Sequence, residues 1–160
     1  MIDDTAAFCG LFCGSCGIYI ATIRNDGKEL ERIAQMMKTG IEEIPCRGCR
    51  SDVLSPHCRM CGFKSCAKTR NLNNCEECGE FPCDALRDFQ KQLPHRTELF
   101  ESAQYRNEHG IDQWLEKMRE DYSCEKCGEI NSPYYTACRK CGNEPANPFI
   151  PRSIPTFRKT

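Results

Sequence analysis

Cysteine is the residue type through which this chain could do chemistry. The chain has 15 cysteines among its 160 residues. Eight of them lie in one central stretch, at Cys46, Cys49, Cys58, Cys61, Cys66, Cys75, Cys78 and Cys83. Thiolates are strong ligands for zinc and for iron–sulfur clusters. This density of thiols therefore predicts bound metal ions that take over part of the work of a hydrophobic core.

Disulfides are the alternative use of so many cysteines, and the sequence argues against them. The N-terminus, Met-Ile-Asp-Asp-Thr-Ala-Ala-Phe, has no charged region followed by an apolar run, so we see no signal peptide. No apolar stretch approaches the length of a membrane span. The count of 15 is also odd. We therefore expect a reduced cytoplasmic protein whose cysteines bind metal.

The C-terminal cysteines give the strongest signal for a metal site. Cys124 and Cys127 form one C-x2-C pair, and Cys138 and Cys141 form a second pair ten residues later. Two such pairs at this spacing are typical of a zinc ribbon, in which four sulfurs surround one zinc ion tetrahedrally. We expect residues 121–143 to form this ribbon as a separate unit.

Glycine follows five of the C-x2-C pairs directly, at Gly17, Gly62, Gly79, Gly128 and Gly142. In a metal-binding turn the backbone N–H groups point at the first sulfur, and the residue after the pair tends to need positive φ. Glycine adopts positive φ without steric cost. The pattern therefore favours metal-binding turns over scattered thiols.

The eight central cysteines are enough for two four-sulfur sites. A division in sequence order assigns Cys46, Cys49, Cys58 and Cys61 to one ion and Cys66, Cys75, Cys78 and Cys83 to another. Spacing alone does not exclude an interleaved arrangement in which the pairs are divided between sites.

The N-terminal cysteines, Cys9, Cys13 and Cys16, make a trio that lacks a fourth ligand. His57, which adjoins Cys58, is our first candidate for that ligand. The other candidates are His95, His109, a water molecule and a central cysteine released by regrouping.

Zinc is the metal we expect, at three to four ions per chain. An iron–sulfur cluster at the N-terminal or central cysteines is the alternative, because it uses the same thiolate ligands. No Ser-His-Asp set, phosphate-binding glycine loop or paired-carboxylate motif is visible, so we assign no catalytic residue.

Hydrophobic spacing predicts helices between the cysteine groups. One begins at Asp26 and ends near Gly40, with Glu29 completing a capping box. Further helices are predicted after Asp84, over 97–108 and from Ile111, with Trp114 as a buried anchor. We expect a small metal-stabilised α+β fold: short helices around cysteine-rich loops over 1–120, the zinc ribbon over 121–143, and an extended tail over 144–160.

The order of these motifs resembles a known family. The resemblance lies in the stretches Phe8-Cys9-Gly10-Leu11-Phe12-Cys13-Gly14-Ser15-Cys16, Cys46-Arg47-Gly48-Cys49, His57-Cys58, Cys66-Ala67-Lys68, Cys75-Glu76-Glu77-Cys78-Gly79-Glu80-Phe81-Pro82-Cys83 and Gly110-Ile111-Asp112-Gln113-Trp114-Leu115. Together they are similar to the uncharacterised cysteine-rich domain of unknown function numbered 3795. The resemblance implies a prokaryotic protein that binds zinc and has no assigned activity.

These observations favour a multi-zinc structural or binding protein that interacts with another protein and not with a membrane. The alternative is an iron–sulfur protein that transfers electrons or carries clusters. A third reading is nucleic-acid binding through the ribbon and the basic residues Arg152, Arg158 and Lys159. The third reading ranks last, because metal-bound thiolates make the protein strongly acidic and nucleic-acid binding needs a basic face.

Overall fold

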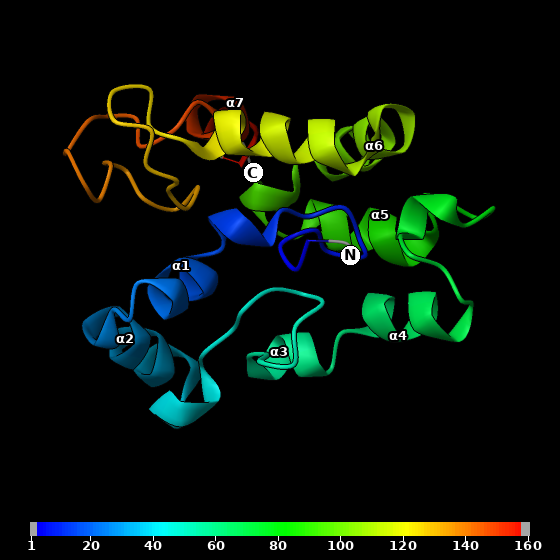
Figure 1. Ribbon diagram of the computed structural model, residues 1–160, viewed down its shortest axis with the longest axis horizontal. Helices are drawn as coiled ribbons and strands as arrows, with labels where there is room; N and C mark the ends of the chain where they lie inside the picture. The colour runs from blue at the N-terminus through cyan, green and yellow to red at the C-terminus, as the bar shows by residue number, and fades with distance from the viewer. Residues whose placement is uncertain (1–2, 158–160) are drawn as a thin grey trace.

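The computed structural model describes residues 3–157, and helices are its regular elements. The α-helices are α1 (Gly17–Ile23), α2 (Gly27–Met37), α3 (Pro56–Arg59), α4 (Gly62–Thr69), α5 (Asp84–Lys91), α6 (Leu99–Tyr122) and α7 (Phe149–Phe157). The single turns of 3-10 helix are η1 (Cys13–Ser15), η2 (Ile41–Glu43), η3 (Cys75–Glu77) and η4 (Pro94–Arg96). Figure 1 shows α6 and α7 along one side of the molecule and α2 and α3 along the other.

The expected α+β class is wrong, because residues 3–157 contain no strand. Two isolated bridges, Ala6 to Phe12 and Ser123 to Ile130, are the only sheet-like pairings in this part of the chain. The composition gives the reason: the sequence has one valine, and its apolar residues recur at helical spacing. The cysteine-rich segments then close into local turns and do not pair with one another as strands.

The predicted helix at Asp26 is confirmed at its start. The Asp26 carboxylate accepts a hydrogen bond of 3.1 Å from the Glu29 backbone N–H, which caps α2. The helix ends at Lys38, which has a left-handed φ of 54°, two residues before the expected stop at Gly40. The helix predicted after Asp84 is also present, as α5.

The two helices predicted on either side of Gly110 appear as the two halves of α6. Gly110 has φ 82° and ψ 171°, which interrupts the helical path between them. The halves come together over the N-terminal segment. Trp114 is fully buried, as predicted, and its ring lies 6.0 Å from the Phe12 ring. The Trp114 indole N–H donates to the Ser102 hydroxyl at 2.9 Å, so each half of α6 contributes to this contact.

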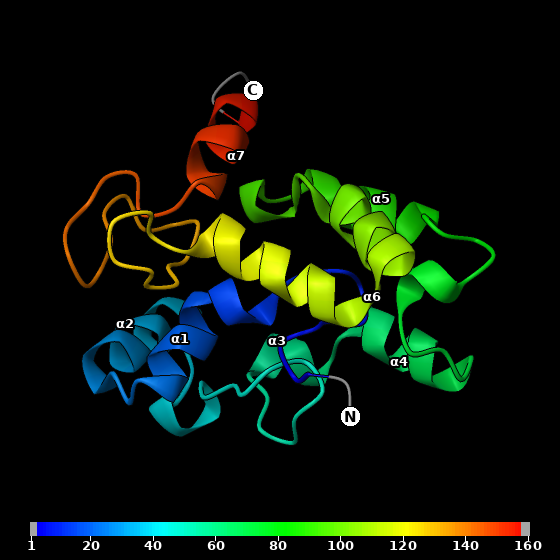
Figure 2. The same ribbon diagram turned by 45° about the horizontal axis from the view of Figure 1, so that its top comes forward.

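The tail differs from the extended chain we expected, because Phe149–Phe157 forms α7. Phe149 is buried and its ring lies 4.8 Å from the Tyr122 ring at the end of α6. Arg152 pairs with Glu98 at 2.9 Å and with Asp121 at 3.0 Å. These apolar and charged contacts hold α7 near α6 in both views (Figures 1 and 2). Arg158 and Lys159 lie outside the described residues.

One buried ion pair joins three distant parts of the chain. Arg106 of α6 donates to both carboxylate oxygens of Glu76 in η3, at 2.6 and 2.8 Å. It also donates to the Ala7 carbonyl at 2.8 Å, and its guanidinium lies 4.9 Å from the Trp114 ring centre. The side chains of Arg106 and Glu76 are only 2% and 3% exposed. The N-terminal segment is thereby fixed to α6 and to the segment that carries Cys75.

We predict that Glu76→Gln lowers the free energy of unfolding by about 3–5 kcal/mol, because it leaves the Arg106 charge buried without its counter-ion. Urea denaturation of the metal-loaded protein, followed through Trp114 fluorescence, measures this loss. Glu80→Gln is the matched control, since Glu80 is 67% exposed and pairs with Arg70 at the surface. The control is expected to cost at most about 1 kcal/mol, and equal losses in the two variants would contradict the prediction.

Candidate metal centre

The ribbon segment, residues 121–143, contains two turns with the same hydrogen bonds. In the first turn the Gly128 N–H donates to the Cys124 carbonyl at 2.8 Å, and in the second the Gly142 N–H donates to the Cys138 carbonyl at 2.9 Å. Gly128 and Gly142 have φ values of 71° and 72°. The predicted need for positive φ after the pair is therefore confirmed in both turns of this segment.

The same prediction is wrong elsewhere. Gly17 and Gly62 are the first residues of α1 and α4, and Gly79 also lacks a positive φ. A helix that begins directly after a cysteine pair needs negative φ at that position. In the pair from Cys46 to Cys49 the positive φ, 110°, falls inside the pair at Gly48.

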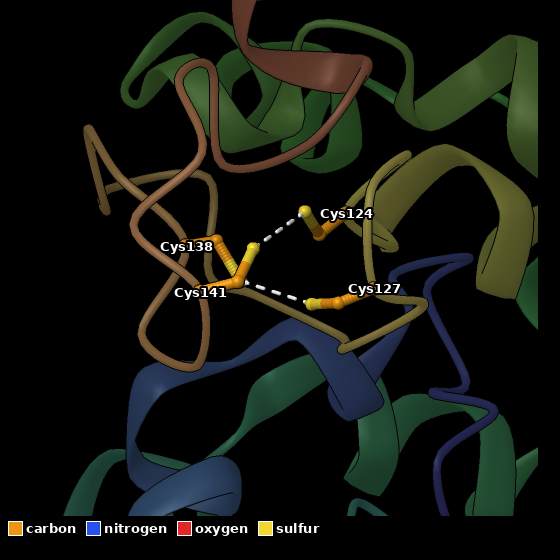
Figure 3. A group of neighbouring side chains, drawn as sticks. All are labelled: Cys124, Cys127, Cys138 and Cys141. Carbon is orange, nitrogen blue, oxygen red and sulfur yellow. Dashed lines mark hydrogen bonds between the residues drawn. The ribbon is translucent and has the colours of Figure 1, made fainter.

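The four ribbon cysteines converge on one point, as Figure 3 shows. Their sulfurs all lie within 4.8 Å of one another. The Cys124 and Cys141 sulfurs are 3.6 Å apart, as are those of Cys127 and Cys138. A tetrahedron with Zn–S bonds of about 2.3 Å has edges of about 3.8 Å. The four cysteines therefore have the spacing needed to hold a metal ion.

Backbone and amide N–H groups favour the charged form of one of these thiols. Burial opposes ionisation of Cys138, yet hydrogen bonds from the backbone of Cys141 and Lys140 and from the Asn131 side chain lower its pKa to about 6. A thiol that ionises readily is ready to bind a cation.

Asn131 connects the two turns and was missed by reasoning from the sequence. Its side-chain amide donates to the Glu129 carbonyl at 2.8 Å and to the Cys138 sulfur at 3.4 Å, and its side-chain oxygen accepts from the Arg139 N–H at 3.0 Å. The residue is fully buried. An asparagine between two C-x2-C pairs was the only available signal, and its partners are known only from the fold.

The ribbon segment contacts the helices before it. Arg24, just after α1, pairs with Glu129 and donates to the Ile130 carbonyl at 3.2 Å. Arg139 lies 3.4 Å from the Glu29 carboxylate of α2. These charged contacts position the ribbon segment against α1 and α2. The domain boundaries given above remain a prediction.

The other eleven cysteines are not gathered as tightly. Among residues 3–157, only the four ribbon cysteines form a group of three or more candidate ligand side chains whose ligand atoms all lie within 4.8 Å of one another. All 15 cysteines are free thiols. The N-terminal and central cysteines nevertheless form contacts across the chain. Cys9, Cys13, Cys49, Cys75 and Cys83 all pack in one apolar cluster around Leu86 and Leu99.

Two pairs of thiols from different segments interact directly. The neighbouring Cys49 thiol raises the pKa of Cys13 well above its usual value, and Cys13 in turn lowers the pKa of Cys49 to about 6. The Cys58 thiol likewise raises the pKa of Cys46, and Cys46 lowers that of Cys58. In each pair, the thiol with the lowered pKa ionises readily, and the thiol with the raised pKa stays protonated beside it.

The histidines differ in their surroundings. His57 is exposed in α3, next to Cys58. His95 shares a hydrogen bond of 2.6 Å with the Tyr134 hydroxyl, and burial lowers its pKa to about 4. His109 stacks on Tyr105 with ring centres 4.2 Å apart. The ligand role proposed for His57 therefore stays a prediction.

Residues 5–88 match the family described as "Protein of unknown function (DUF3795)". This span covers slightly more than half of the chain. The chain belongs to this family. The match includes the N-terminal and central cysteines and ends before the ribbon segment. No curated protein and no solved structure matches the chain.

Within residues 3–157, no helix is both long enough and apolar enough to cross a bilayer.

We predict that Asn131→Ala weakens metal binding at the ribbon cysteines by about 10–100-fold, the usual effect of removing a group that orients a metal ligand. Competition with a chromophoric chelator measures the affinity. Asn143→Ala is the control, because the Asn143 side chain donates to the Pro145 carbonyl at 3.3 Å and contacts no sulfur. Unchanged affinity in Asn131→Ala would mean that the amide does not act on Cys138.

Proposed function

We propose that this protein holds three to four zinc ions as structural elements and that its folded surface binds another protein. The observation that carries the metal assignment is the convergence of Cys124, Cys127, Cys138 and Cys141 within 4.8 Å. Zinc suits a closed set of four sulfurs because it has no redox chemistry and accepts tetrahedral geometry. Fifteen free thiols supply ligands for three four-sulfur sites and one three-sulfur site.

The need for metal also follows from the composition. Cysteines are included in the 39% of residues counted as hydrophobic, so the apolar residues available for a core are fewer than that figure implies. A structural zinc site can supply about 10–16 kcal/mol of apparent folding free energy at neutral pH. That amount is as large as the net stability of a typical domain. Metal binding therefore offsets the small core.

The proposed protein partner is supported by apolar side chains exposed on the surface. Met60, between α3 and α4, is 82% exposed, and Met36 of α2 is 66% exposed. Methionine is common at surfaces that bind other proteins, because its unbranched side chain adapts to different shapes. Nucleic-acid binding through the tail has weaker support, because Arg152 is paired with Glu98 and Asp121.

Elemental analysis tests the metal assignment. Protein purified without oxygen is expected to be colourless and to contain three to four zinc ions per chain. Removal of the ions with a chelator is expected to unfold the ribbon segment. The far-UV circular dichroism is then expected to fall, because the helices in contact with this segment lose its support. Brown protein that contains iron and acid-labile sulfide would contradict the zinc assignment and support the iron–sulfur alternative.

A substitution at the surface tests the binding role. Met60→Glu is expected to abolish co-purification of a partner from the native host while leaving the zinc content unchanged, because a carboxylate cannot be buried in an apolar contact without cost. Lys68→Glu, at an exposed position of α4, controls for the added negative charge. Partners retained by Met60→Glu, or lost equally from both variants, would argue against a contact through Met60.

A further inference from the structure

Two sulfur–sulfur contacts connect the turns of the ribbon segment. The Cys124 sulfur lies 3.6 Å from the Cys141 sulfur, and the Cys127 sulfur lies 3.6 Å from the Cys138 sulfur. Each contact therefore joins one sulfur of the first C-x2-C turn to one of the second. Figure 3 shows the Cys124 and Cys127 side chains pointing across toward the second turn.

The same spacing suits a second kind of chemistry besides metal binding. The two sulfurs of a disulfide are about 2.05 Å apart, so each of these contacts closes to a covalent bond when the sulfurs approach by about 1.5 Å. A sulfur in a disulfide no longer binds a metal ion, because only the thiolate is a ligand. The four ribbon sulfurs therefore have two mutually exclusive uses, and oxidation decides between them.

Asn131 holds the two turns together through hydrogen bonds that involve no metal ion. Its side-chain amide donates to the Glu129 carbonyl at 2.8 Å, just after the first turn. Its side-chain oxygen accepts from the Arg139 N–H at 3.0 Å, inside the second turn. The residue is fully buried, so water does not compete for these bonds. The facing sulfurs therefore stay within reach of each other while an ion leaves.

Each facing pair combines an accessible cysteine with a buried one. Cys124 and Cys138 are only 2% and 3% exposed, whereas Cys127 and Cys141 are half-buried. An oxidant from the solvent therefore reaches Cys127 and Cys141 first. The sulfenic acid that forms on an accessible cysteine condenses with a neighbouring thiol to give a disulfide. In both pairs the buried cysteine is in position to supply that thiol.

Bonds between the turns preserve the contacts of the ribbon segment with the rest of the molecule. Arg139 of the second turn lies 3.4 Å from the Glu29 carboxylate of α2. The Asn147 side chain, which leads into α7, donates to the Asn131 carbonyl at 2.9 Å. Both contacts need the turns to remain side by side, as a metal ion or a pair of cross-turn disulfides holds them. Disulfides formed within each turn would leave the two turns unconnected.

We propose that the ribbon segment is a site of oxidation by hydrogen peroxide, at which two cross-turn disulfides replace the metal ion. Cys127 pairs with Cys138, Cys124 pairs with Cys141, the zinc ion is released, and the segment keeps its fold. The release of zinc rests on the proposed metal-binding function, to which it adds regulation of the same site. The pairing of the sulfurs rests on the two contacts of 3.6 Å.

Each disulfide consumes one molecule of hydrogen peroxide. The Cys127 thiolate forms an S–O bond as the O–O bond of the peroxide breaks, and uptake of one proton gives a sulfenic acid and one water. The Cys138 thiolate then attacks the Cys127 sulfur, the S–O bond breaks, and a second proton is taken up to release a second water. The two sulfurs lose two electrons and the peroxide gains both. Cys141 and Cys124 react in the same way, and the zinc ion leaves as Zn²⁺.

Peptide mapping of the full-length protein tests the pairing. Protein purified without oxygen is treated with hydrogen peroxide, free thiols are blocked with N-ethylmaleimide, and trypsin digests the unreduced protein. Catalase added before the peroxide gives the unoxidised control. Trypsin cleaves after lysine and arginine, so the ribbon cysteines fall into three peptides, 120–126 with one cysteine, 127–139 with two and 141–152 with one.

Mass spectrometry is expected to find the middle peptide two hydrogens lighter, because its two cysteines are bonded to each other, and the first peptide linked to the third. Disulfides within the two turns would link all three peptides into one species, as would the diagonal pairing of Cys124 with Cys138. Either result overturns the proposal. Oxidation of Cys127 and Cys141 to sulfonic acids without disulfides, or bonds from the ribbon cysteines to other cysteines, would overturn it as well.

Hydrogen exchange compares the oxidised ribbon segment with the metal-free one. The amides of residues 127–139 are expected to stay protected after peroxide treatment and to lose protection when a chelator removes zinc under reducing conditions. Equal loss of protection in both samples would show that the disulfides do not replace the ion. Protein that contains no zinc before treatment would refute the proposed function instead, and since the peptide pairing is measured in either case, the two failures are distinguishable.

Discussion

A buried positive charge, that of Arg106 in α6, fixes the segments that contact it. Arg106 is 2% exposed and has three partners, the Glu76 carboxylate, the Ala7 carbonyl and the Trp114 ring. A buried guanidinium must be neutralised and hydrogen-bonded, so the segments that supply these partners are held in one place. Two of the partners adjoin cysteine-bearing turns. The charge on α6 therefore positions the thiols of two segments that lie far apart in the sequence.

Local patterns in the sequence predicted the parts of the fold that depend on neighbouring residues. The α2 helix follows from Asp26 and its apolar stripe, and the break at Gly110 follows from one glycine between two such stripes. The spacing of the ribbon cysteines predicted the one group within residues 3–157 whose sulfurs converge. Each of these features is set within a few turns of chain, so spacing and residue type are sufficient.

The rest could not be predicted because it depends on contacts between distant segments. α7 is stabilised by Tyr122, Glu98 and Asp121, none of which lies near it in the sequence. The hydrogen bonds of Asn131 to Cys138 and Arg139 need the ribbon turn to be closed first. Spacing placed Cys46 beside Cys49, but Thr22 and Ala6 decide which way the chain faces around each of them.

The bond between Arg106 and the Ala7 carbonyl joins residues that are 99 positions apart. A ribosome that adds 5–20 residues per second takes roughly 5–20 s to synthesise that interval. During this time the N-terminal segment has left the ribosome without the helix that covers it, and the thiols of Cys9 and Cys13 are open to oxidation. Newly made chains are therefore more sensitive to oxidants than complete ones.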